Sequence, residues 1–274
     1  METKEEPAPI DLSLVRKEHE ALRKATKRRF ERGAFIEPSD DSDVGELIWM
    51  APLAVQELGK ETDEMEASVR PGALTMDPSG QAVVDTERLT IYLISSRVRL
   101  GQQRFDQLTY LWFYPPRATG GAIGWRGCRI ILSKQRFGVV WEALSSDATQ
   151  RVFYVPKSLE KASEKEYGPP LAGRRHAVEP SLEDYPNVVV ARVVGDGPRP
   201  MGPFVYLDQS LTVTTMMCRC DPAQVDAFPQ SVDYRLTPID SMRDLYKGDT
   251  PPRNLHLPNP SDDLSTILRL PSEL

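Results

Sequence analysis

Two neighbouring runs of alternating residues, 88–100 and 103–114, constrain the fold of this chain more than any other feature. They read RLTIYLISSRVRL and QRFDQLTYLWFY, and only Gly101 and Gln102 separate them. Glycine at the first central position suits a two-residue type II′ turn, which connects antiparallel strands. The sequence therefore predicts a β-hairpin.

The same turn sets the register of the hairpin. It brings opposite charges and aromatic–aliphatic neighbours face to face across the strands, as stable ladders prefer. The expected pairs are Arg97 with Asp106, Val98 with Phe105, Ile94 with Thr109, Tyr92 with Leu111 and Leu93 with Tyr110. Arg99 falls opposite Arg104, so both of these side chains must point to water. Away from the turn both faces are apolar, and we expect this end of the hairpin to be buried on two sides.

A row of three aromatic residues lies on one face of the second strand, because alternation aligns Tyr110, Trp112 and Tyr114. An exposed row could stack on sugar rings or on a peptide, whereas a buried row is core. Ile91 and Leu93 of the first strand fall beside the row, so the core interpretation is favoured.

Further short runs broken by turn residues continue the strand pattern: Cys128–Ser133, Gly138–Leu144, Arg151–Val155, Val188–Val194, Phe204–Leu207, Thr212–Cys218 and Val232–Thr237. Good helix formers at Lys157–Glu166 interrupt the series. The predicted class is α+β, mainly β, with an antiparallel β-sandwich or a partly closed barrel. We expect this core domain at 85–240, after a connecting segment at 41–84 in which residues 47–58 form a short helix or an entry strand.

An N-terminal helix is expected at 11–32, within a first segment that covers 1–40 and has a disordered start at 1–10. Asp11 or Ser13 could cap the helix. The helical stretch carries eight Lys and Arg residues against four acids, an excess of four positive charges. A helix docked on its own protein is favoured, with a protein partner or an anionic surface as the alternatives.

The last segment, 241–274, is predicted to be an extended, proline-rich arm with a short anchor at Leu264–Leu270. Such an arm and the N-terminal helix would wrap the core domain or reach a partner. We therefore expect a protein partner or self-association through residues 11–32 and 249–274.

Composition excludes several classes of function. The chain has 274 residues and a net charge of −6, so no general attraction to nucleic acid is expected. It has no apolar run long enough to span a membrane, and its charged start has no signal-peptide core. Three cysteines fit a reducing compartment better than a disulfide scaffold, so a cytoplasmic location is expected.

Two of these cysteines, Cys218 and Cys220, stand in the stretch MMCRCDP. In an extended strand their Cα atoms are about 6.5–7 Å apart, which is too far for two thiolates on one zinc ion and at the limit for a disulfide. The thiols meet only if the chain bends at Arg219. Packed thiols are favoured. A zinc site from Cys128, Cys218, Cys220 and His176, or a redox role for the pair, is the alternative.

The loop at 168–180, GPPLAGRRHAVEP, collects groups that could bind a ligand: Arg174, Arg175, His176 and Glu179. The arginines could clamp a carboxylate or a phosphate, and the histidine could act as general acid and base. In the competing interpretation the arginines neutralise an acidic surface and the histidine satisfies a backbone carbonyl.

Common catalytic and nucleotide-binding motifs are missing from the sequence. Glu142, in GVVWEAL, could act as an acid if it were partly buried, but we expect it to face water on the side opposite Trp141. Three hypotheses follow. The first is a non-enzymatic protein-binding or assembly module without a cofactor. The second is a metal- or thiol-dependent protein that uses Cys218 and Cys220, and the third is an enzyme that acts on an anionic small molecule bound at 168–180.

Overall fold

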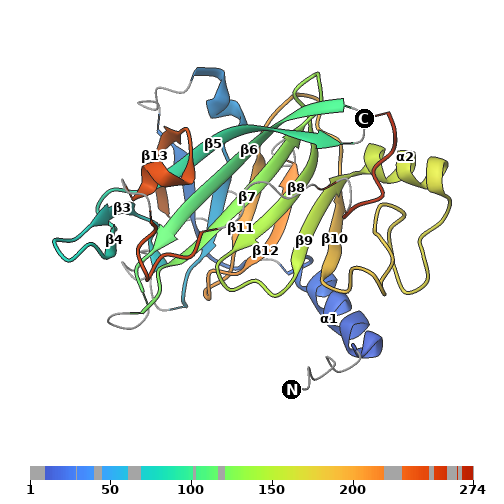
Figure 1. Cartoon of the computed structure of the whole chain (residues 1–274), viewed down its shortest axis with the longest axis horizontal. Helices are drawn as coiled ribbons and strands as arrows, with labels where there is room; N and C mark the ends of the chain where they lie inside the picture. The colour runs from blue at the N-terminus through green and yellow to red at the C-terminus, as the bar shows by residue number, and fades with distance from the viewer. Residues whose placement is uncertain are drawn as a thin grey trace, which may run out of the picture.

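A large β-sheet with α-helices at its edges dominates the computed structural model of the chain (Figure 1). The structure describes residues 10–28, 30–39, 45–60, 69–100, 103–116, 121–218, 230–246, 250–257, 264 and 267–273. The disordered start predicted at 1–10 therefore lies almost wholly outside the described residues.

Eleven strands of the described chain form one sheet, in the order β10-β9-β8-β7-β6-β5-β13-β1-β2-β11-β12. Their bounds are β1 Gly33–Pro38, β2 Leu53–Glu57, β5 Thr90–Leu100, β6 Gln103–Tyr114, β7 Gly124–Leu132, β8 Gly138–Ser145, β9 Arg151–Pro156, β10 Val188–Val194, β11 Pro203–Leu207, β12 Val213–Cys218 and β13 Gln230–Ile239. The two end strands, β10 and β12, lie side by side, so the sheet is nearly closed. A small antiparallel sheet of β3 (Ala73–Met76) and β4 (Ala82–Asp85) packs against β6 of the main sheet. The predicted class, mainly β with a partly closed barrel, is confirmed.

The predicted hairpin is confirmed in β5 and β6, and its register is the expected one. Arg97 pairs with Asp106, Leu93 with Tyr110 and Tyr92 with Leu111. The Arg97 guanidinium lies 3.4 Å from the Asp106 carboxylate on the surface. Arg99 and Arg104 are both exposed, as their opposition requires. The turn residues lie outside the described part of the chain.

The sheet is mixed rather than antiparallel, which corrects the strand directions expected from the sequence. Within the described residues four neighbouring pairs are parallel: β1 with β13, β2 with β11, β5 with β13 and β9 with β10. Alternation reveals which face a side chain takes but not the direction of the neighbouring strand. The sheet also includes β1 and β2, which precede the domain expected at 85–240, and the stretch 47–58 holds both a 3-10 helix, η1 (Gly45–Met50), and β2.

The largest buried cluster draws side chains from all eleven strands of the main sheet, so it fills the interior of the nearly closed barrel. The aromatic row lies in it, with Tyr110, Trp112 and Tyr114 at most 2% exposed. The Trp112 indole donates a 3.0 Å hydrogen bond to the Tyr114 hydroxyl, which satisfies one buried polar group with another. The core interpretation of the row is confirmed.

Helix α1 (Leu12–Ala25) packs on both end strands of the sheet, β10 and β12 (Figure 1). Asp11 caps it, because its side chain accepts hydrogen bonds from Ser13 N at 2.9 Å and Leu14 N at 3.3 Å. The helix is shorter than the predicted 11–32, since the chain turns after Ala25 and buries Phe30 beside Tyr206. The docked interpretation of this helix is confirmed.

The second helix and the C-terminal residues cover the outer face of β7 to β10. Helix α2 (Lys157–Tyr167) buries Leu159 in a cluster with Phe153, Leu264 and Leu268. The predicted anchor at Leu264–Leu270 is thus in contact with the sheet. Another 3-10 helix, η4 (Met242–Leu245), follows β13. Over the described residues no helix is long and apolar enough to cross a membrane.

Candidate functional site

The loop at 168–180 is held in place by one of its own arginines. Arg174 is 8% exposed and donates to the backbone oxygens of Pro180 at 2.7 Å, Val188 at 2.5 Å, Ser181 at 3.0 Å and Tyr185 at 2.6 Å. Its guanidinium therefore closes the loop onto the start of β10. This arrangement turns Arg174 inward, away from any ligand in solvent.

Glu179 of the same loop is fully buried and joins the loop to α1 and to β10. Its two oxygens accept from the backbone nitrogens of Arg175, His176 and Val190, each at 2.9 Å. It also pairs with the Arg23 guanidinium at 2.7 Å. Arg23 is 5% exposed, so the pair is shielded from water. Glu179 thus fixes the position of the residues around it.

The other two predicted ligand residues, Arg175 and His176, line a cavity of about 600 Å³ beside the seam between β10 and β12. We call this cavity the seam pocket. Its walls come from the end of α1, the residue Phe30, the loop at 168–180 and the strands β10, β11 and β12. Its volume is within the range of small-molecule sites, which is about 300–1,000 Å³.

Cationic side chains gather in the seam pocket. Five of them line it: Arg23, Lys27, Arg28, Arg175 and Arg192. Three carboxylates pair with members of this set: Glu20, Glu57 and Glu179. Five positive charges less three negative ones leave a formal charge of +2 in a chain whose net charge is −6. The pocket is therefore a positive spot on an acidic protein.

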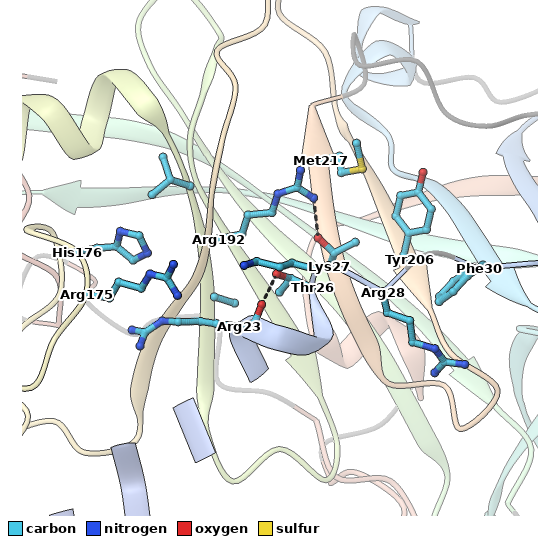
Figure 2. Close-up of a pocket in the computed structure, with 13 residues that line it drawn as sticks. Arg23, Thr26, Lys27, Arg28, Phe30, Arg175, His176, Arg192, Tyr206 and Met217 are labelled. Carbon is cyan, nitrogen blue, oxygen red and sulfur yellow. Dashed lines mark hydrogen bonds between the residues drawn. The ribbon is translucent and has the colours of Figure 1, made fainter. Parts of the chain in front are cut away.

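Lys27 and Arg192 account for this excess. Among the described residues neither has a carboxylate within ion-pair distance, and both lie in the middle of the pocket (Figure 2). Arg192 reaches from β10 across the seam and donates to the Thr215 hydroxyl of β12 at 3.3 Å. This bond ties together the two ends of the sheet and holds the guanidinium over the opening.

Apolar side chains form the opposite wall. Phe30, Tyr206 and Met217 lie on one side of Lys27 and Arg192, and Arg175 and His176 lie on the other (Figure 2). The rings of Phe30 and Tyr206 meet edge to face with centroids 5.6 Å apart. The Arg28 guanidinium also lies on this side, 5.9 Å from the centroid of the Phe30 ring. The seam pocket therefore offers cations in its middle and aromatic rings along one wall.

The surroundings of His176 favour its neutral form. Burial lowers its pKa below the ordinary value, although the negative charges of Glu179 and Glu160 oppose the shift. Its Nδ1 lies 3.8 Å from a Glu160 oxygen, and that carboxylate accepts from the backbone nitrogens of Ala177 and Val178. A neutral imidazole can accept or donate one proton, so His176 keeps the capacity for acid–base work.

Of the three cysteines, only Cys128 is described together with its side chain. Cys128 is completely buried in the interior cluster, where burial raises the pKa of its thiol well above the ordinary range. Cys220 and the side chain of Cys218 lie outside the described residues, as does Arg219. In the part of the chain that is described, no group of three potential metal ligands forms. The zinc and thiol hypothesis therefore stays a prediction.

Glu142 does not face water as expected, because it is 2% exposed. Its carboxylate lies 2.9 Å from the Arg129 guanidinium and 2.7 Å from that of Arg151. Helix α2 and the C-terminal residues cover this face of β8, which a strand read in isolation does not reveal. Glu142 is thus part of a buried ion cluster inside the fold.

Several pocket residues had no signal as site residues in the sequence. Phe30, Arg192, Tyr206 and Met217 come from segments far apart in the chain, and only folding brings them together. The excess of positive charge at 11–32 was the one visible hint, since that stretch supplies three of the pocket's five cations.

The chain matches no protein-family model, no curated protein and no solved structure. Its function has therefore to be inferred from the seam pocket itself.

Proposed function

We propose that this protein is a binding module that holds an anionic ligand in the seam pocket. The observation that carries the proposal is the excess of two positive charges at Lys27 and Arg192, which form no close ion pair with a carboxylate among the described residues. Charges held in a concave site attract a complementary ion more strongly than charges on a flat surface. An anion is the species that such a site takes.

The surroundings of the two cations favour binding of a small anion over a polyanion. The chain as a whole is acidic, so a long phosphate backbone is repelled outside the pocket. Arg23 and Arg28 are already paired with Glu179 and Glu57, which leaves Lys27 and Arg192 for the ligand. A guanidinium offers two parallel donors to a carboxylate or phosphate, and an ammonium adds a point charge.

Calorimetric titration of the full chain with inorganic phosphate and with pyrophosphate tests the proposal. Lys27→Met and Arg192→Met keep an apolar stem and remove the charge, and each should weaken binding by about tenfold to 150-fold, since a hydrogen bond to a charged group contributes about 1.5–3 kcal/mol. Lys24→Met and Arg199→Met are the matched controls, because both residues are exposed and neither lines the pocket. Equal effects in all four variants, or no binding by the native chain, would reject the proposal.

Catalysis on the bound anion is the second candidate, because His176 lines the pocket. Incubation of the protein with a bound anion, followed by NMR of the small molecule, tests it. A product that forms with the native chain and fails to form with His176→Ala, while the anion still binds, would support an enzyme. Unchanged ligand after long incubation would remove this candidate.

Assembly through residues 11–32 and 249–274 stays a prediction. The inner side of α1 packs on the main sheet, where His19 and Arg23 are buried, but Ile10 and Leu14 are more than half exposed. These two apolar side chains are what a partner could contact. If they hold copies of the chain together, Leu14→Glu should lower the mass measured by sedimentation equilibrium. An unchanged mass would contradict self-association through this helix. The cytoplasmic location also stays a prediction.

A further inference from the structure

The seam pocket has two unlike walls, and a ligand that fills it must match both. Lys27 and Arg192 lie between the side that holds Arg175 and the side that holds Phe30 and Tyr206 (Figure 2). An inorganic anion satisfies the cations but leaves the aromatic side in water. An apolar molecule covers the rings but leaves the cations without a partner.

Volume gives the first constraint on the ligand. A water molecule occupies about 30 Å³ in the liquid, so a cavity of this size holds on the order of twenty of them. The volume of about 600 Å³ is thus far more than one phosphate group needs. The remaining space adjoins the aromatic wall, where a flat ring can be buried.

Charge gives the second constraint. The pocket carries two positive charges that the carboxylates paired with its arginines do not balance. A phosphomonoester carries about −1.5 to −2 charges at pH 7, whereas a carboxylate carries one. The phosphomonoester therefore balances the pocket, and a single carboxylate leaves one cation without a counterion. Its three terminal oxygens also provide acceptors for both the Lys27 ammonium and the Arg192 guanidinium.

The aromatic wall gives the third constraint. Phe30 is 7% exposed, and its edge-to-face contact with Tyr206 holds both rings at the surface of the pocket. A third ring placed against this pair gains further aromatic contacts, and Met217 beside them adapts to its shape. A ligand with an aromatic ring uses this wall in a way that an aliphatic chain of the same size does not.

We infer that the ligand is a small phosphomonoester that carries an aromatic ring, with its phosphate on Lys27 and Arg192 and its ring against Phe30 and Tyr206. This inference rests on the proposed function and specifies the chemical class of the anion. The phosphate supplies the charge, and the ring supplies selectivity among anions.

Competition between three probes tests the inference on the full chain. Phenyl phosphate has both features, methyl phosphate lacks the ring, and benzoate lacks the phosphate. Phenyl phosphate should bind about tenfold more tightly than either of the other two. Adenosine monophosphate and free O-phosphotyrosine then distinguish a nucleotide from a phosphorylated amino acid, and tighter binding of either one supports the inference and names the source.

Replacement of a ring by leucine distinguishes the loss of an aromatic contact in the pocket from a general effect on the fold. Phe30→Leu should weaken phenyl phosphate about fivefold or more and leave methyl phosphate unchanged. Phe35→Leu is the matched control, because Phe35 packs against Phe204 in the same cluster and does not line the pocket. Tyr206→Leu provides a second test if Phe30→Leu lowers the melting temperature so far that binding is not measurable.

Two patterns of results overturn the inference and remain distinguishable. If methyl phosphate or benzoate binds as tightly as phenyl phosphate, the inference is wrong while an anion site remains. If neither these probes nor inorganic phosphate bind, the proposed function is wrong as well.

Discussion

Replacement of Glu179 by glutamine tests how α1, β10 and the loop that connects α2 to β10 are held together. The buried carboxylate takes four hydrogen bonds on two oxygens. Oε1 accepts from Arg23 Nη2 at 2.7 Å and from Val190 N at 2.9 Å. Oε2 accepts from the backbone nitrogens of Arg175 and His176, both at 2.9 Å. Glutamine keeps the shape but replaces one oxygen by an amide group that donates.

The cost of Glu179→Gln follows from these contacts. Whichever way the amide is oriented, two donors face its nitrogen, and each buried donor without an acceptor costs about 1–3 kcal/mol. Removal of one partner of a buried ion pair costs about 3–5 kcal/mol. Arg23 keeps its 2.8 Å contact with Glu20, which offsets part of the loss. We expect the free energy of unfolding to fall by about 3 kcal/mol.

Urea unfolding followed by circular dichroism measures this change. Glu20→Gln is the matched control, because Glu20 is the other carboxylate on Arg23 but its side chain is 59% exposed. That variant should lose less than about 1 kcal/mol. If both variants lose the same small amount, Glu179 does not hold α1 on the sheet, and the reasoning is refuted.

Three further predictions concern single side chains. Burial, and then the positive charges of Arg174 and Arg23, lower the pKa of His19. The unfolded chain therefore binds a proton at this histidine more readily than the folded protein does. The free energy of unfolding should fall as the pH drops below about 6.5, by at most about 1.4 kcal/mol per pH unit for one proton. Thermal melting of the native chain and of His19→Gln between pH 7.5 and pH 5.5, roughly the window in which histidine titrates, checks this, and equal slopes would contradict it. Leu268→Ala should lower the free energy of unfolding by about 3 kcal/mol in a urea titration, because the side chain is 3% exposed in the cluster under the C-terminal residues. A loss below about 1 kcal/mol would mean that packing of Leu268 on the sheet contributes little to stability. Cys128 should resist iodoacetamide in the native protein and react once urea unfolds it, since burial raises the pKa of its thiol. Peptide mapping by mass spectrometry that finds Cys128 modified as fast in the native protein as in the unfolded chain would contradict its burial.

The hairpin was predictable from the sequence because its information is local. A two-residue turn with glycine fixes which residues pair, and alternation fixes which face each side chain takes. The pairing of Arg97 with Asp106 and the burial of Trp112 both follow from these two rules. The cap at Asp11 is local in the same way, since it depends on the first turn of one helix.

The closure of the sheet was not predictable in the same way. Strand β13 lies between β5 and β1, and both neighbours run parallel to it although they are far away in the chain. No turn connects these strands, so no local signal sets their order or direction. The burial of Glu142 has the same origin, because Val140, two residues before it on the same face of β8, packs in a cluster with Leu159 of α2 and with Leu268, which come later in the sequence.

The candidate site was predictable only in part. His176 and Arg175 stood out as a loop cluster, and they do line the pocket. From the sequence, their neighbours Arg174 and Glu179 were equally good candidates for ligand binding. In the structure both make internal hydrogen bonds, because burial and not residue type decides which charged side chains remain available to a ligand. Arg192 gave no signal, since its position over the seam depends on the two ends of the sheet meeting.

The most direct test of the anion site is a crystal structure of the full chain grown with phenyl phosphate. We expect the phosphate oxygens at about 2.7–2.9 Å from the Lys27 ammonium and the Arg192 guanidinium, with the ring against Phe30 and Tyr206. An empty seam pocket at a saturating concentration of phenyl phosphate would contradict the inferred ligand, and a pocket that also stays empty in crystals grown with inorganic phosphate would contradict the proposed function.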